Sequence, residues 1–173
     1  TYPSTHTAGF LALATMTAFV QSKMTIGSRD GLGFNEQYLM LAPTGFGKEE
    51  ARNPLRILHE ATGDGTSPTL HWAAPPSAQG IHQCLEDDNS VYFLADEFAD
   101  WLKSSHTDGH RSLALNYVMQ CYSKALSKTH PGRAASANYE DVLNPRLSIL
   151  ATSTGEAIYQ AMSRGQAESG AYN

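Results

Sequence analysis

A glycine-rich turn carries the first residues whose types and spacing could do chemistry. In "APTGFGKE", residues 42–49, two glycines precede Lys48, and an apolar run comes before the turn. Polyphosphate binding needs backbone N–H groups turned toward the ligand, which glycine permits, and a helix N-terminus behind them. The turn departs from the phosphate-binding pattern G-x-x-x-x-G-K-[ST] at Ala42 and Glu49, so by itself it is weak evidence for a nucleotide site.

Glu49 stands where the phosphate-binding pattern has the hydroxyl that reaches Mg²⁺. A carboxylate can also ligate Mg²⁺, directly or through a water molecule, but it then places a negative charge near the phosphates. The alternative is a solvated acid in the first turn of a helix. Both interpretations of Glu49 stay open on the sequence alone.

A pair of acids ends the second candidate segment, "VYFLADE", at Asp96 and Glu97. One carboxylate at the end of a strand can hold a metal-bound water, and the next can polarise an attacking water as a general base. The plain alternative is an acidic helix N-terminus, where the helix dipole favours Asp and Glu in any case. Taken alone, the pair does not decide between these interpretations.

Three hydroxyls end the third candidate segment, "LSILATST", at Thr152, Ser153 and Thr154. A hydroxyl at the end of a buried strand could sense a terminal phosphate. Thr154 is better explained as the N-cap of a helix that begins near Glu156. The sequence leaves the choice between Thr152 and Ser153 open, because the end of a predicted strand is uncertain by a residue or two.

The elements that must position these residues alternate between apolar runs and helical patterns. The apolar runs lack polar alternation, which is typical of a parallel sheet with helices on both faces. The predicted strands are 38–42, 69–74, 90–98 and 146–154. The predicted helical segments are 5–22, the segment after the glycine turn, 77–88, a stretch that runs to about Lys128, and a last helix that Gly165 ends.

The three candidate segments each follow or end a predicted strand. In parallel α/β sheets, ligands bind beyond the carboxyl ends of the strands. The glycine turn, the acid pair and the hydroxyls are separated by about 50 and then about 55 residues, in the order that a P-loop ATPase requires. Chance rarely produces all three in this order, so we predict a nucleotide site.

The helix predicted after the glycine turn contains Asn53 and Pro54. Proline cannot donate a backbone hydrogen bond inside a helix, and it disfavours helical geometry at the residue before it. Asn53 as an N-cap, with Pro54 at the first helical position, would suit a new helix start. We therefore predict that the helix following the turn is short, or kinked near residue 53.

Composition and charge bound the class of protein. The 173 residues suit one domain, with 41% hydrophobic residues, 17% charged residues and a net charge of −5. Cys84 and Cys121 lie far apart without C-x-x-C spacing, which argues against a disulfide framework or a zinc ribbon. The most apolar segment, residues 8–20, is shorter than the roughly 20 residues that a bilayer needs, and no basic region precedes it. We expect a soluble, cytoplasmic protein without a membrane partner.

Two further patterns have a functional and a plain interpretation. Between Lys103 and Arg133 the chain carries five lysines and arginines against one acid, Asp108. This charge could give sequence-independent affinity for single-stranded DNA or RNA, or it could be a solvated helix face. In "HTDGH", His106 and His110 flank Asp108 as metal ligands could, but a polar loop is the favoured interpretation.

The three motifs together resemble the P-loop ATPases of the RecA/AAA+ class. In that resemblance, "APTGFGKE" corresponds to Walker A, "VYFLADE" to Walker B and "LSILATST" to the sensor-1 strand. More narrowly, the chain resembles the helicase- or primase-helicase-like ATPase domains of phages, plasmids and other mobile elements. The resemblance covers nearly the whole chain and implies one RecA-like domain over residues 1–173, with a helix before the P-loop. The sensor-1 strand would lie between the other two.

The resemblance also implies ATP and Mg²⁺ as cofactors and a role for each motif. Lys48 would hold the β and γ phosphates, Asp96 the Mg²⁺ shell and Glu97 the attacking water. Thr152, or else Ser153, would contact the γ-phosphate. Glu49 departs from most members, but it matches AAA+ activators of the alternative sigma factor, which carry G-x-x-G-x-G-K-E. The nucleotide-binding loop would comprise Pro43, Thr44, Gly45, Phe46, Gly47, Lys48 and Glu49.

The function that the resemblance implies is an ATP-hydrolysing motor, a helicase or a primase-helicase. Its partners would be copies of itself, with a hexameric ring as one arrangement, and single-stranded nucleic acid bound between Lys103 and Arg133. Because the sequence ends at Asn173, before the arginine finger of such ATPases, we expect a fragment that hydrolyses ATP slowly alone. The alternatives are a non-helicase AAA+ ATPase, a small-molecule kinase, and an ATP-binding module with little hydrolysis.

Overall fold

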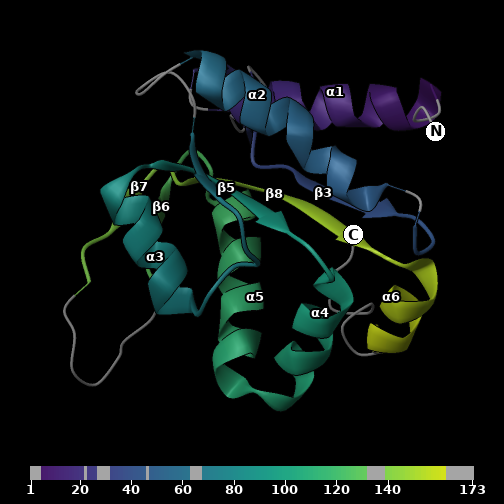
Figure 1. The fold of residues 1–173 in the computed structure, drawn as a ribbon. Coiled ribbons are helices and arrows are strands. Elements are labelled where there is room, and N and C mark those ends of the chain that lie inside the picture. Colours follow the sequence, from purple (N-terminus) through teal and green to yellow (C-terminus); the bar gives the residue numbers. More distant parts are fainter. Residues whose placement is uncertain are drawn as a thin grey trace.

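A four-stranded sheet forms the centre of the computed structural model (Figure 1). Its strand order is β3–β8–β5–β4, and each neighbouring pair of strands is parallel. The strands are β3 (Gln37–Leu41), β4 (Thr69–His71), β5 (Ser90–Ala95) and β8 (Arg146–Ser153). The structure describes residues 5–21, 23–26, 32–45, 47–62, 68–131 and 139–162.

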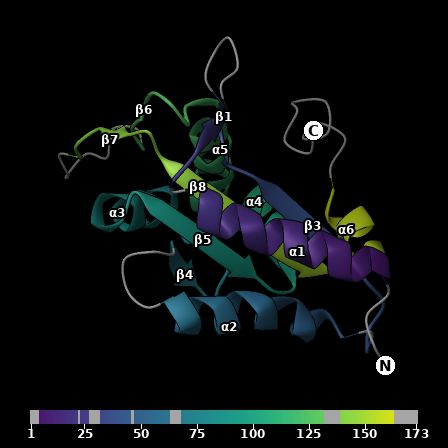
Figure 2. The same ribbon diagram turned by 90° about the horizontal axis from the view of Figure 1, so that it is seen from above.

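Helices cover both faces of this sheet (Figures 1 and 2). One face carries α1 (Thr5–Val20) and α2 (Asn53–Thr62). The other face carries α3 (Ala78–Asp87), α4 (Phe98–Thr107), α5 (Gly109–Ser123) and α6 (Gly155–Ala161). The protein is therefore of the α/β class with a parallel sheet, as the unbroken apolar runs predict. The expected central position of the 146–154 strand is also confirmed, because β8 lies between β3 and β5.

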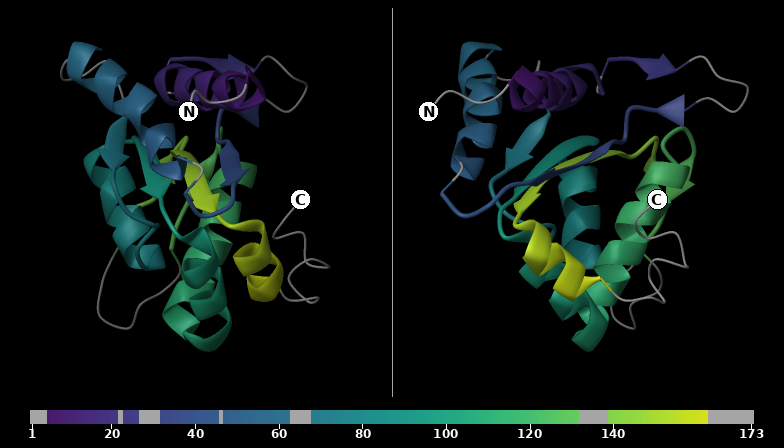
Figure 3. Two further views of the ribbon diagram at one scale, coloured as in Figure 1. Left: turned by 45° about the vertical axis from the view of Figure 1, so that its right-hand side comes forward. Right: turned by 90° about the vertical axis from the view of Figure 1, so that its right-hand side faces the viewer.

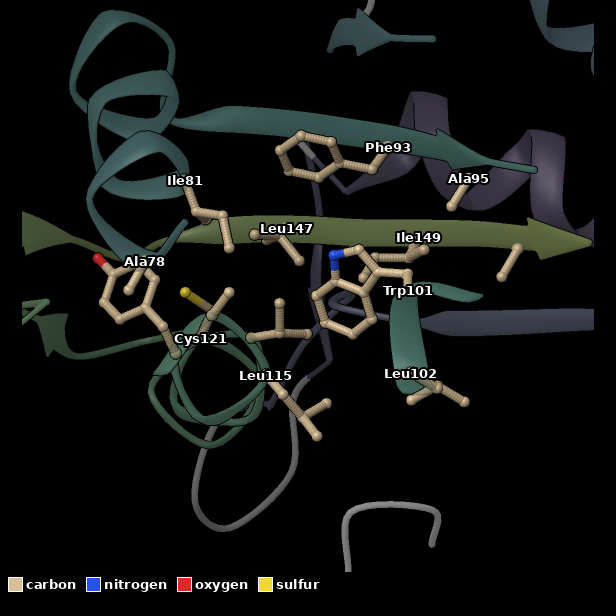
Figure 4. Close-up of a cluster of buried hydrophobic side chains, with 14 of the residues drawn as sticks. Ala78, Ile81, Phe93, Ala95, Trp101, Leu102, Leu115, Cys121, Leu147 and Ile149 are labelled. Atoms are coloured by element: carbon tan, nitrogen blue, oxygen red, sulfur yellow. The ribbon is translucent and has the colours of Figure 1, made fainter. Parts of the chain in front are cut away.

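Successive side chains of the two central strands enter two separate cores. Phe93 and Ile149 pack on the side of α3, α4 and α5, in the larger cluster that contains Trp101 (Figure 4). Tyr92 and Leu150 belong to the smaller cluster on the side of α1 and α2. Side chains on a strand alternate between the two faces of the sheet, so a strand covered on both faces must be apolar throughout. Burying each large side chain contributes about 1.5–3 kcal/mol.

Several predicted boundaries differ from the observed ones by a few residues. The 90–98 strand ends at Ala95, because Glu97 is in the left-handed region at φ 47 and α4 begins at Phe98. The 69–74 strand ends at His71, the last residue that pairs with β5. The final helix ends at Ala161 rather than at Gly165, which lies outside the described residues. The N-cap predicted for Thr154 is confirmed, since its hydroxyl accepts the Ala157 N–H.

Two short antiparallel ladders were not predicted from the sequence. They join β1 (Thr25–Ile26) to β2 (Leu32–Gly33), and β6 (Lys128–Thr129) to β7 (Val142–Leu143). Each strand has only two residues, too few to show a period of two in the sequence. The helix-rich stretch is likewise divided in two, because Asp108 ends α4 and caps α5 by accepting the His110 N–H.

The segment after the glycine turn changes its winding at the predicted place. A 3₁₀ helix, η1 (Lys48–Arg52), leads directly into α2 at Asn53. In an α-helix the Glu50 carbonyl would accept from residue 54, but Pro54 has no N–H, so it accepts from Asn53 instead. The break near residue 53 is therefore confirmed. The N-cap role of Asn53 is wrong, because its φ of −59 and ψ of −45 are already helical.

Two expectations about the surface and the cysteines can be compared with the described residues. Within the described ranges, no helix combines the length and apolarity that crossing a bilayer demands. Cys84 and Cys121 are both free thiols, in agreement with the absence of a predicted disulfide framework.

β3 is an edge strand of the sheet (Figure 3), and its Leu39 and Leu41 side chains are exposed.

Candidate functional site

The carboxyl ends of three neighbouring parallel strands, β3, β8 and β5, lie side by side at one end of the sheet. The register pairs Met40 of β3 with Thr152 of β8, and Ala95 of β5 with Ala151 of β8. Beyond β3, the Ala42 N–H donates to the Ser153 carbonyl at 3.1 Å. The glycine turn after β3, the acid pair after β5 and the hydroxyls at the end of β8 are therefore neighbours, as the sequence predicts.

The glycine turn has the backbone conformation that its sequence indicates. Gly45 and Gly47 have φ values of 80 and 75, in the left-handed region that other residues rarely adopt. Among the described residues, nothing lies within 4 Å of a Cβ added at Gly45, so the backbone angle, and not crowding, requires glycine there. Pro43 and Thr44 are exposed in the same turn. The turn therefore has open space beside it, next to the start of η1.

Lys48 begins η1 and reaches across to the end of β5. Its Nζ lies 3.8 Å from Oε1 of Glu97, and only 11% of the Lys48 side chain is exposed. This ammonium group therefore links the glycine turn to the acid pair. An ammonium group in this position can hold a phosphate oxygen once it leaves Glu97.

Asp96 is the most connected residue of the site. Its Oδ1 accepts the Thr152 hydroxyl at 2.6 Å and the Glu97 N–H at 2.9 Å, and its Oδ2 lies 3.1 Å from Nη2 of Arg52. Burial acts to raise the pKa of Asp96. The two hydrogen bonds and the charges of Arg52 and Lys48 outweigh that effect and hold this pKa below its ordinary value. Asp96 is therefore ionised at neutral pH.

Arg52 is a member of the site that the sequence patterns did not single out. It belongs to no phosphate-binding pattern, yet its guanidinium group forms the ion pair with Asp96. The signal that could have found it is its position four residues after Lys48, within the same short helical segment. We call Lys48, Arg52, Asp96, Glu97 and Thr152 the strand-end cluster.

Glu97 has an unusual backbone for its residue type. Its φ of 47 and ψ of 44 are left-handed, a conformation that costs a non-glycine residue about 1–2 kcal/mol. Its carboxylate makes no capping hydrogen bond to α4, and 62% of the side chain is exposed. Glu97 therefore stands at the N-cap position of α4, as the acidic helix N-terminus interpretation expects, but its side chain does not cap the helix. Strained backbone of this kind collects at functional sites.

The structure separates the two hydroxyls that the sequence left undecided. Thr152 and Ser153 are both buried, but successive residues of a strand face opposite sides of the sheet. Thr152 lies on the side of Asp96 and donates to it. The Ser153 hydroxyl has no hydrogen-bond partner among the described residues. Thr152 thus joins the strand-end cluster, and Ser153 does not.

The residues present fit a divalent cation in part. The carboxylates of Asp96 and Glu97 and the Thr152 hydroxyl are oxygen donors, the type that Mg²⁺ prefers. The Arg52 guanidinium group already places a positive charge beside the Asp96 carboxylate. Among the described residues, no group of three His, Cys, Asp or Glu could hold a metal ion. Any cation here would therefore keep several water or phosphate ligands, as Mg²⁺ usually does.

Other predicted residues fall outside what can be placed. Phe46 is not among the described residues, and of Glu49 only the backbone, within η1, is described. The metal role predicted for Glu49 therefore stays a prediction. The side chain of His106 also lies outside the described set.

The four described cations of the Lys103–Arg133 stretch do not all lie together. Lys103 lies 3.9 Å from Asp100, and Lys128 lies 2.6 Å from Asp141. The exposed Arg111 and Lys124 lie at opposite ends of α5, which at 15 residues is about 22 Å long. Arg133 is outside the described residues. A contact with nucleic acid through this stretch stays a prediction.

A groove elsewhere on the molecule is separate from the strand-end cluster. It has a volume of about 910 Å³ and lies between α5 and the start of β3, at Glu36 and Gln37. Gln37 begins β3, whereas the strand-end cluster lies beyond its last residue, Leu41. The groove is therefore at the amino ends of the strands, where parallel α/β sheets do not usually bind ligands.

No protein-family model matches the chain, and no significant match was found among curated proteins or solved structures. The functional interpretation of this α/β domain therefore rests on the geometry of its strand-end cluster.

Proposed function

We propose that the chain is a P-loop ATPase domain of the RecA/AAA+ class that binds and hydrolyses ATP with Mg²⁺ at the strand-end cluster. The observation that carries the proposal is the convergence of three separate motifs. Lys48 of the glycine turn lies 3.8 Å from Glu97, and Asp96 accepts a hydrogen bond from Thr152. The motifs come from three strands about 50 residues apart in sequence, yet they meet at the edge where such sheets bind ligands.

In the proposed mechanism the glycine turn and Lys48 bind the phosphates. The left-handed glycines let backbone N–H groups face a polyphosphate, and the Lys48 ammonium group exchanges Glu97 for phosphate oxygens. When bound, Mg²⁺ supplies positive charge that polarises the phosphoryl oxygens. Asp96, already ionised, would hold the Mg²⁺ shell, with Thr152 keeping its carboxylate oriented.

Glu97 is the proposed general base for the attacking water. Its carboxylate is exposed, so water can reach it, and the exchange of Lys48 onto phosphate leaves it without its counterion. The left-handed backbone of Glu97 holds the side chain at the strand end instead of folding it back onto α4. This geometry supports hydrolysis over simple ATP storage, which would not need Glu97.

The finer assignment within this class is a helicase- or primase-helicase-like motor. It rests on the resemblance of the three motifs, and it brings with it a homo-oligomer and single-stranded nucleic acid as partners. A non-helicase AAA+ ATPase is the alternative, which the sequence G-x-G-K-E at the end of the glycine turn favours. Stimulation of ATP hydrolysis by single-stranded DNA or RNA would support the motor, and an unchanged rate would support the alternative.

Calorimetric titration with ATP and Mg²⁺ tests the central proposal. Lys48→Ala removes a charge-assisted contact, worth roughly 1.5–3 kcal/mol, so ATP should bind about 10- to 150-fold more weakly. Lys103→Ala is the matched control, because Lys103 also lies about as far from its acid, at 3.9 Å, but on α4. Equal ATP affinity in the wild type and the Lys48 variant would contradict the proposed site.

A further inference from the structure

Two ion pairs link four members of the strand-end cluster. Lys48 lies 3.8 Å from Glu97, and Arg52 lies 3.1 Å from Asp96. Both cations come from η1, and both acids come from the turn between β5 and α4. The two positive and two negative charges balance one another without any ligand.

The Asp96 carboxylate has a donor or a cation on each oxygen. Oδ1 accepts from Thr152 and from the Glu97 N–H, and Oδ2 faces the Arg52 guanidinium group. A divalent cation bound to Asp96 would therefore lie close to the Arg52 charge. Two positive charges a few ångströms apart repel each other, so one of them must leave.

The Arg52 pair can open without disrupting the core. The Arg52 side chain is 27% exposed and that of Asp96 is 39% exposed, so water reaches both groups. Partly exposed ion pairs contribute little to stability, in general about 1 kcal/mol or less. The ion pair is thus weak enough for Arg52 to leave Asp96. While the pair is formed, Arg52 is close enough to Asp96 to repel a divalent cation there.

We propose that Arg52 is an exchangeable counterion that keeps divalent cations off Asp96 until a nucleotide is bound. This inference rests on the proposed function and adds a control step to the same site. ATP brings several negative charges, which attract the guanidinium group away from Asp96 and leave the carboxylate to the Mg²⁺ that accompanies the nucleotide. Binding of Mg²⁺ and of ATP is therefore coupled through one side chain.

Titration with Mn²⁺ in the absence of nucleotide, followed by electron paramagnetic resonance of the free ion, tests this coupling. Arg52→Gln should bind Mn²⁺ about two- to fivefold more tightly than the wild type, because Asp96 loses its competing cation. Arg52→Lys, which keeps the charge, should return the affinity toward that of the wild type. Arg56→Gln is the matched control, since Arg56 pairs with Glu60 on the exposed side of α2 and should change nothing.

The double variant Arg52→Gln with Asp96→Asn identifies the binding group. It should lose the gain in Mn²⁺ affinity, and a gain that persists without Asp96 would overturn the inference. Equal Mn²⁺ affinity in the wild type and Arg52→Gln would also overturn it. The ATP titration with Lys48→Ala reports separately on the proposed function, so a failed counterion role and a failed ATP site are distinguishable.

Discussion

Two groups of polar side chains lie against the same sheet, one at the carboxyl ends of its strands and one between α3 and α5. The first is the strand-end cluster. The second, which we call the histidine cluster, is centred on a buried imidazole and consists of His82, Glu86, Tyr117, His130 and Tyr139. Both contain acids or bases within hydrogen-bond or ion-pair distance, so their residue types alone do not distinguish them.

Burial separates the two groups. His82 is fully buried, and its Nδ1 lies 2.6 Å from the Tyr117 hydroxyl, with Nε2 3.2 Å from Oε1 of Glu86. Burial raises the pKa of Tyr117, so its hydroxyl stays protonated and serves as a hydrogen-bond partner. In the strand-end cluster, by contrast, Asp96 and Glu97 are 39% and 62% exposed. The buried centre of the histidine cluster, His82 with Tyr117, supports the fold, whereas acids that water reaches can exchange their partners for a ligand.

The largest expected effect concerns hydrolysis. Glu97→Gln removes the proposed base, which should lower the ATPase rate about 10²- to 10⁴-fold while ATP affinity stays equal or increases, because Lys48 loses its counterion. Steady-state phosphate release and calorimetric titration measure the two quantities. Glu60→Gln, at a similarly exposed acid on α2, is the control. A rate unchanged by Glu97→Gln would assign the site to ATP binding without hydrolysis.

Substitutions in the histidine cluster should change the stability of the fold. His82→Ala leaves a cavity and removes the partner of the Tyr117 hydroxyl, which should lower the free energy of unfolding by about 2–4 kcal/mol. Urea denaturation measures the loss. His110→Ala, at an exposed position of α5, should change it by less than about 0.5 kcal/mol. The contrast between the clusters fails if His82→Ala leaves stability intact.

Adjacent hydroxyls of β8 provide a finer comparison. Thr152→Val removes a donor to Asp96 and should lower the free energy of unfolding by about 0.5–1.5 kcal/mol, as well as weakening ATP–Mg²⁺ binding. Ser153→Ala removes a buried hydroxyl that has no partner among the described residues, so stability should be unchanged or higher. Thermal denaturation and titration of both variants check this. Equal effects would mean that the two hydroxyls are not separated as described.

The smallest expected effect is a dependence on pH. The pKa of folded Asp96 lies below its ordinary value of 3.8, so its ionised form contributes stability above that pH. The contribution is lost as the pH falls below 3.8 and through the lowered pKa. The difference in unfolding free energy between the wild type and Asp96→Asn should therefore shrink below pH 3.8. A difference that is constant from pH 6 to pH 3 would contradict this sign.

Much of the fold could be predicted because its two central strands, β5 and β8, are buried on both faces. Unbroken apolar runs indicated the parallel sheet, and polar residues at the strand ends indicated the site. The left-handed backbone at Glu97, which stops β5 at Ala95, has no signature in a residue that is not glycine. The two-residue ladders are too short to carry a period.

The sequence predicted that the motif residues of the candidate site lie near one another, but it did not predict their contacts. Lys48, Asp96 and Glu97 converge because strand ends share an edge. The separation of Thr152 from Ser153 depends on which face each occupies, which requires the exact register of β8. Arg52 was missed because a pattern of fixed letters ends before it. The pairing of His82 with a tyrosine 35 residues away depends on how two helices pack, which local sequence does not encode.

The 3₁₀ winding of η1 sets the directions in which its two cations point. With three residues per turn, Lys48 and Arg52 lie about 120° apart around the helix axis, whereas in an α-helix the angle would be about 40°. At the wider angle each cation faces a different acid, Glu97 or Asp96. Pro54 withholds the N–H that the Glu50 carbonyl would accept in α-helical winding. A proline outside every motif thereby contributes to the angle between the Lys48 and Arg52 side chains.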